Sequence, residues 1–259
     1  MDRAERKRQT KEDEKKVSRG IDLTNRSQDQ SIALARLVYA QFERAKRERN
    51  VDPPIRFLYS KVSETLAGAG RIELACAKGC GHCCHGWVSA SAPEVLYAVK
   101  EIRRRNESKV FTAIADAAHS TKNLTAAERM RQPTPCPLLK DGACSIYEWR
   151  PMLGRIMAST DAATCKRGFM EQSGEPLPIP APFLAARGVF GVVTVAALKQ
   201  AGLTYHFYEF NAALEAALAR EDAESAWLQG EDVFAGVQRN QDDIASRPHV
   251  VQLHSRAFT

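Results

Sequence analysis

CAKGCGHCC, at residues 76–84 of a 259-residue chain, concentrates four thiols in nine residues, and we expect the fold to be built around it. Clustered thiols oxidise and cross-link unless they bind something, and thiolates are good ligands for zinc and for iron–sulfur clusters. Three more cysteines follow further along the chain. We predict that all seven are metal ligands: Cys76, Cys80, Cys83, Cys84, Cys136, Cys144 and Cys165.

The number of thiols exceeds what one simple site needs. A structural zinc takes four ligands, so seven cysteines predict either two sites or a polynuclear cluster. The spacing leaves the cofactor open between zinc and an iron–sulfur cluster. His82 and His85 flank the Cys83–Cys84 pair and could each replace a thiolate, although a polar loop role is the simpler interpretation of both. Nearby cations could offset thiolate charge, namely Arg150, Arg155, Lys166 and Arg167.

Composition is that of a globular protein, with 44% hydrophobic and 26% charged residues. The chain is long enough for a full core, so the metal is expected to serve a site rather than to rescue a small fold. Net charge is +6, half of it in residues 1–20. The rest of the chain carries no basic stripe interleaved with aromatic residues, so we do not expect nucleic-acid binding. Nothing in the sequence specifies a protein partner.

The sequence suggests a cytoplasmic location. The N-terminus is charged and has no apolar stretch of the kind found in secretory signals. The longest apolar run, Val189–Leu198, is interrupted by Gly191 and Thr194 and is short for a membrane span, so no membrane partner is expected. In the cytoplasm thiols stay reduced, which favours metal ligation over disulfides.

Helical periodicity dominates the chain. Leu34, Leu37, Val38 and Phe42 share one face of a predicted helix at 31–48. Another begins at Pro53–Pro54 and runs to about residue 66. Ser91 and Glu94 form a capping-box pattern that starts a third, running to about residue 105. Further helices are predicted near 109–122, 161–170, 183–201, 205–220 and 222–235.

Extended structure is predicted at three places. Residues 87–90 read as a short strand, and 136–147 as a β-hairpin turning at Asp141–Gly142, with Cys136 and Cys144 on opposite arms. Residues 175–182, EPLPIPAP, form a proline-rich strap. The fold class is therefore mainly α with a small β-hairpin element, as a single irregular helical domain around a cysteine-ligated metal site. We predict a charged disordered tail at 1–24, the cysteine-cluster domain at 25–235 and a poorly ordered C-terminal tail at 236–259.

Several motifs together resemble the YkgJ-type cysteine-cluster family. They are CxxxCxxCC at residues 76–84 and CPLL…GACSIY..RP at 136–151, followed by DAATC at 161–165, IPAP at 179–182, FNAAL at 210–214 and WLQGEDVF at 227–234. The resemblance covers most of residues 55–235 and implies zinc or iron chelation. The family pattern continues RPxxCR, whereas this chain has Gly154 at the cysteine position, so eight family cysteines become seven.

Three functions stay open at this point. The first is a metal-binding protein with a structural, storage or transfer role. The second is an iron–sulfur-dependent enzyme that modifies proteins, since some related cysteine-cluster proteins resemble flagellin lysine N-methylases. The third is a helical interaction module braced by zinc, marked by exposed apolar residues on the C-terminal helices. The C-x3-C-x2-C spacing also occurs in radical-SAM enzymes, but repeated βα units are missing from the pattern, so that fold is not expected.

Overall fold

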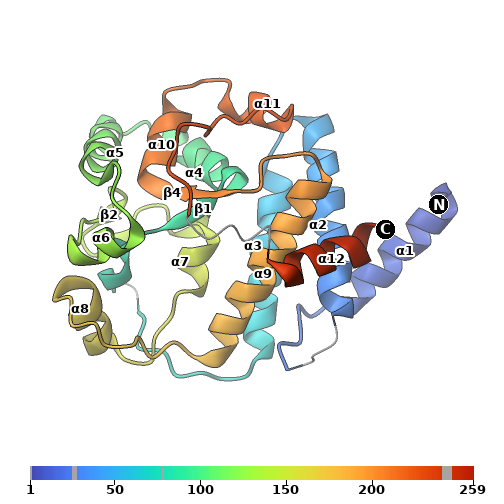
Figure 1. Ribbon diagram of the computed structural model, residues 1–259, viewed down its shortest axis with the longest axis horizontal. Coiled ribbons are helices and arrows are strands. Elements are labelled where there is room, and N and C mark those ends of the chain that lie inside the picture. The colour runs from blue at the N-terminus through green and yellow to red at the C-terminus, as the bar shows by residue number, and fades with distance from the viewer. Residues whose placement is uncertain (1, 25–27, 78, 241–246) are drawn as a thin grey trace.

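Amphipathic helices make up most of the molecule in this computed structural model, which describes residues 2–24, 28–77, 79–240 and 247–259 (Figure 1). The fold class is therefore mainly α, as predicted. The α-helices are α1 (Arg3–Lys16), α2 (Asp29–Glu48), α3 (Asp52–Gly68), α4 (Ala92–Arg105), α5 (Ser108–Thr121), α6 (Ala126–Arg131), α7 (Met152–Ile156), α8 (Ala162–Met170), α9 (Ala181–Gln200), α10 (Phe210–Leu218), α11 (Ala223–Leu228) and α12 (Pro248–Phe258). Two short 3-10 helices are η1 (His82–His85) and η2 (Tyr147–Trp149).

Two small antiparallel sheets complete the fold. The predicted hairpin is confirmed as β2 (Leu139–Lys140) and β3 (Ala143–Cys144). The second sheet pairs β1 (Ser89–Ser91) with β4 (Phe207–Glu209), in the register Ala90↔Tyr208. The helix predicted from residue 205 is thus wrong for its first turn, because Tyr208 is fully buried in this ladder. The helix proper begins only at Phe210, where the Glu209 carboxylate accepts the N–H of Ala212.

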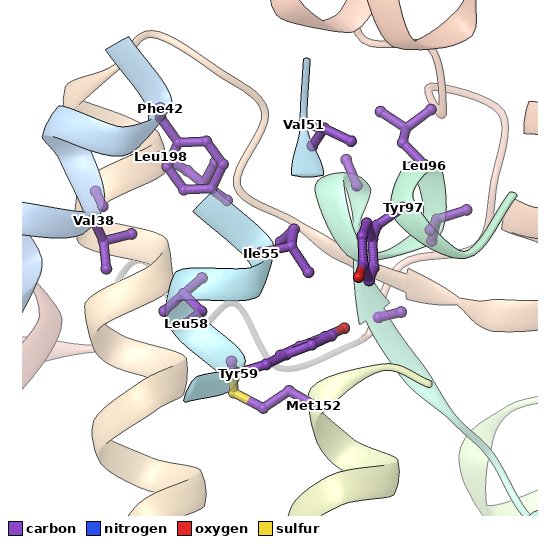
Figure 2. Close-up of a cluster of buried hydrophobic side chains, with 14 of the residues drawn as sticks. Val38, Phe42, Val51, Ile55, Leu58, Tyr59, Leu96, Tyr97, Met152 and Leu198 are labelled. Carbon is purple, nitrogen blue, oxygen red and sulfur yellow. The ribbon is translucent and has the colours of Figure 1, made fainter. Parts of the chain in front are cut away.

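The main core lies between α2, α3, α4 and α9. Figure 2 shows Phe42 of α2 beside Leu198 of α9, with Ile55 and Leu58 of α3 next to them. All four side chains are fully buried, and each contributes about 1.5–3 kcal/mol on transfer from water. Cys136 and Cys144 are partly buried and pack against the same core, so the thiol-lined cavity adjoins it.

Both ends of the chain contain a described helix, α1 near the N-terminus and α12 near the C-terminus. Asp2 and Glu5 form a capping box that starts α1, and Val17 beyond its end is buried. Helix α12 packs on α9 and α2 through Val250, Leu253 and Ala257, one apolar stripe at helical spacing. Residues 241–246 of the predicted C-terminal tail and 25–27 of the predicted domain lie outside the described residues. The division into tails and domain stays a prediction.

Helix α9 is longer than the apolar run that the sequence suggested. Among the described residues it is the helix whose length and composition would allow it to cross a membrane. Half of its most apolar window is buried inside the protein, where α9 packs against α2, α3 and α12. The core helix of a folded domain has the same composition.

The Glu101 carboxylate of α4 makes the free energy of unfolding depend on pH. Its carboxylate is 3% exposed and accepts hydrogen bonds from Arg104 (Nε, 2.7 Å) and Arg105 (Nε, 2.6 Å), which lower its pKa to about 2. Since the unfolded value is about 4.3, this stabilisation is complete above that pH and is lost as the pH falls towards 2.

We expect Glu101→Gln to lower the free energy of unfolding at pH 7 by about 1–2 kcal/mol, because the three charge-assisted bonds from Arg104 and Arg105 weaken while Arg104 stays mostly in solvent. Urea denaturation at pH 7 and pH 3 measures the effect. The difference between variant and parent should shrink at pH 3, and a difference that is the same at both values would contradict the assignment.

Candidate metal centre

All seven cysteines line a single cavity of about 300 Å³. The segments that bring them there are the loop through η1, the β2–β3 hairpin and helix α8. These segments span about ninety residues of sequence, and no local pattern requires them to meet. The predicted ligands are therefore gathered on one surface: Cys76, Cys80, Cys83, Cys84, Cys136, Cys144 and Cys165.

Four of these thiols form a first group where α8 packs against η1. They are Cys76, Cys80, Cys83 and Cys165. Asp161 caps α8 by accepting the N–H of Ala163 and Thr164, which fixes Cys165 on its first turn. The segment before α8 pairs with the start of the cysteine loop, since the Ala75 N–H donates to the Ser159 carbonyl (2.9 Å). The Ser159 N–H in turn donates to the sulfur of Cys76 (3.3 Å).

The electrostatics of the first group (Cys76, Cys80, Cys83 and Cys165) are those of mutually close thiols. Burial raises the pKa of Cys76, and charge on Cys80, Cys165 and Cys83 raises it further. Burial also raises the pKa of Cys165, and negative charge on Cys83 and Cys80 raises it further. Repulsion among neighbouring thiolates disfavours their ionisation together, and a bound cation removes that penalty. Four such thiols supply the full ligand set of one zinc or iron ion.

The remaining thiols, Cys84, Cys136 and Cys144, form a second group at the hairpin. The Cys136 N–H donates to the Cys84 carbonyl (2.8 Å), which ties the hairpin to η1. Cys144 lies on β3 opposite Leu139. Burial raises the pKa of Cys136 to about 12, and the nearby Cys144 contributes in the same direction.

The two groups adjoin at the Cys83–Cys84 pair. A hydrogen bond between these two thiols is the largest cause of the raised pKa of Cys83. His82 also lines the cavity. His85 instead turns its Nδ1 towards the carbonyls of Gly81 (3.1 Å) and His82 (3.3 Å), which fits the polar loop role.

The donors fit a thiophilic metal by type and by number. Across the part of the chain that the structure describes, no three His, Cys, Asp or Glu side chains are already drawn together as ligands. The cavity therefore collects the sulfur atoms without fixing a coordination geometry. Seven soft donors on one cavity suit zinc or iron, whereas carboxylates, the donors that calcium and magnesium prefer, are absent from its lining among the described residues.

Arg129 of α6 is a functional candidate that the sequence analysis missed. It is 1% exposed, and its Nη2 donates to the carbonyl of Gly86 (3.1 Å), directly after η1. Its Nε and Nη1 have no hydrogen-bond partner among the described residues. Burial lowers its pKa, while negative charge on Glu209 and Cys136 raises it. The capping box of Thr125 and Glu128 could have predicted α6, but not the burial of its arginine.

The four cations proposed from sequence separate into two kinds. Arg150 and Arg155 line the cavity. Lys166 and Arg167 point elsewhere and pair with Glu171 (3.8 Å) and Glu175 (2.8 Å). Only the first two can offset charge in the cavity directly.

Gly154, which stands at the family's cysteine position, also lines the cavity. A Cβ added there would meet only the Arg150 side chain, at ordinary contact distances of 3.5 Å and more. The position can therefore accept a larger side chain, and seven thiols line the cavity where an eighth cysteine would have added another.

The hairpin turn presses on the cysteine loop at Gly142, where φ is +76° and an added Cβ would lie 2.9 Å from the Gly79 carbonyl oxygen. We expect Gly142→Ala to destabilise the fold by about 1–2 kcal/mol and to weaken metal binding, because the methyl group displaces the loop. Gly70→Ala is the matched control, since Gly70 has a similar φ of +87° with nothing within 4 Å. Thermal unfolding and metal retention measure both. Equal effects of the two variants would show that backbone strain alone acts.

Comparison with known proteins supports this assignment. Residues 75–172 match the family model described as "CxxCxxCC: Putative zinc- or iron-chelating domain". The match confirms the resemblance and covers all seven cysteines. No curated protein and no solved structure matches the chain.

Proposed function

We propose that this chain, whose residues 75–172 belong to the zinc- or iron-chelating cysteine-cluster family, binds two metal ions in the cysteine-lined cavity. In this proposal the first group, Cys76, Cys80, Cys83 and Cys165, holds one ion. The second group, Cys84, Cys136 and Cys144, holds the other. The observation that carries the proposal is that one cavity collects every thiol in the chain.

The division into two ions rests on proximity and on ligand number. The pKa of Cys76 responds to three thiols of its own group, and that of Cys136 responds to Cys144. Four-coordinate zinc uses four donors, which the first group supplies alone. A cytoplasmic location belongs to the proposal, because reduced thiols are required for the ligands to be available.

Metal binding is proposed as the activity of the protein rather than as a brace for its fold. The labelled core residues in Figure 2, among them Phe42, Ile55 and Leu198, include no cysteine, and Cys136 and Cys144 only pack against the outside of the same core. The brace hypothesis predicted an exposed apolar face on the C-terminal helices. Four apolar residues of this region are buried in the core: Leu214, Trp227, Leu228 and Phe234.

The test is anaerobic purification of the untagged protein, followed by elemental analysis, sulfide determination and a visible spectrum. Two zinc or iron ions per chain without sulfide support the proposal. Inorganic sulfide together with iron would replace it by an iron–sulfur cluster, and would favour the enzyme hypothesis. After chelation, far-UV circular dichroism should still report a helical protein, whereas unfolding on chelation would restore the brace hypothesis.

A further inference from the structure

Two arginines on the cavity wall have no acidic partner. Arg150 donates from Nε to the Gly154 carbonyl (3.0 Å) and from Nη1 to the Tyr147 carbonyl. Arg155 donates from Nε to the Arg150 carbonyl (3.1 Å) and also to the Glu148 carbonyl. Neither forms an ion pair with any described carboxylate. We propose that these two guanidiniums bind the carboxylate of a small organic acid inside the cavity, beside the second thiol group.

The guanidiniums are held in place before any ligand arrives. Arg150 stacks on the ring of Tyr147 at 3.5 Å and Arg155 on the ring of Tyr59 at 3.8 Å. Tyr59 approaches the buried Glu94 (3.4 Å), and the same carboxylate accepts the Met152 N–H (2.5 Å) at the start of α7. Helix α7 and both arginines are thus anchored to the core, which reduces the entropy lost on binding.

The partners of these two arginines differ from those of the nearby Arg105. Arg105 also lies near Cys144, but Glu101 neutralises it (2.6 Å). The hydrogen bonds of Arg150 and Arg155 go to neutral carbonyls. Burial and repulsion by Arg155 lower the pKa of Arg150, and Tyr147, Cys144 and Glu148 oppose that shift without cancelling it. An anion between them removes that repulsion and gains charge-assisted hydrogen bonds.

The size and chemistry of the cavity select the kind of anion. Much of its wall is apolar, formed in part by Val88, Leu138, Ile146, Phe169, Phe183 and Phe210. A volume of about 300 Å³ is at the small end of ligand pockets, and it also has to hold the metal. A carboxylate matches the planar fork of a guanidinium, and a short hydrocarbon body matches the wall.

The inference rests on the proposed function for one further point. The second group offers three thiolates, and four-coordinate zinc accepts a fourth donor from outside the protein. Gly154 also lines the cavity, within contact distance of the Arg150 side chain. A carboxylate held by Arg150 and Arg155 is suitably placed beside the group that lacks a fourth thiol.

The test is calorimetric titration of the metal-loaded full chain with butyrate, after its metal content has been measured. Butyramide, which has the same shape without charge, and inorganic phosphate are titrated in parallel. We expect butyrate to bind and butyramide not to bind. Arg150→Gln and Arg155→Gln should each weaken butyrate binding about tenfold or more, with metal content unchanged. Arg187→Gln removes an exposed charge on α9 and should have no effect.

Three results would overturn the inference and leave metal binding intact. The first is that fully metal-loaded protein does not bind butyrate. The second is that it binds phosphate in place of butyrate. Equal butyrate affinity in the arginine variants and the parent is the third. If instead Arg150→Gln lost metal, the guanidiniums would be counter-charges of the thiolates, and the carboxylate assignment would fall on that ground. Parent protein purified without metal would count against the proposed function itself.

Discussion

Cys80→Ser is expected to remove one of two metal ions per chain and to leave the other. Cys80 belongs to the first group, where its charge bears on Cys76 and Cys165. A serine hydroxyl is a poor donor for zinc or iron beside thiolates. Mutation of a residue that only hydrogen-bonds to a metal ligand typically lowers metal affinity about 10–100-fold. We therefore expect loss of a direct ligand to lower the affinity more than about 100-fold.

Cys136→Ser is the matched variant, because Cys136 belongs to the second group and its N–H is already bonded to the Cys84 carbonyl. It should remove the other ion and spare the first. The double variant should hold neither. Ser173→Ala, at an exposed position after α8, controls for handling and should retain both ions.

Elemental analysis after gel filtration measures these losses, with circular dichroism to confirm that each variant is folded. Loss of both ions from either single variant would show one polynuclear cluster in place of two sites. Full retention in both variants would show that these cysteines are not ligands.

The helices were predictable from sequence wherever an apolar stripe or a cap signalled them. Leu34, Leu37 and Phe42 gave the period of α2, and the Ser91–Glu94 box marked the start of α4, where the structure forms that box. The same reasoning could have found α12, whose buried residues lie at helical spacing. Strand β4 could not be found in this way. Its three residues are extended because they pair with β1, more than a hundred residues earlier.

The candidate site was also predictable only in part. Thiol chemistry and spacing identify the ligands, because few other roles explain four cysteines in nine residues. Their grouping depends on long-range contacts, such as the one between Ala75 and Ser159 that brings Cys76 towards Cys165. The charges around the thiols also depend on the fold. Arg167 lies two residues from Cys165 yet pairs with Glu175, while the distant Arg129 lies near Cys136.

Arg129→Met is expected to weaken metal binding at the second group about 10–100-fold while leaving the metal-free protein at least as stable as the parent. A buried cation with two unpartnered nitrogens is costly unless negative charge lies close to it. Glu209 acts on Arg129 with or without metal, and metal-bound thiolates at Cys136 and its neighbours add further negative charge. Without metal the same thiols are neutral, because burial raises the pKa of Cys136 to about 12. Arg129 therefore favours the loaded state over the empty one, in which Glu209 is the negative charge that acts on it.

Methionine keeps the apolar length of the side chain and removes only the charge and its hydrogen bonds. Competition with a chromophoric chelator measures affinity, and urea denaturation measures stability with and without metal. Arg131→Met changes an exposed arginine two residues along and should alter neither quantity. A variant equally destabilised in both states, with unchanged metal affinity, would show that Arg129 serves only the packing of α6. Opposite signs in the two states require the guanidinium to act on the thiolates, because a purely structural contact would act on both states alike.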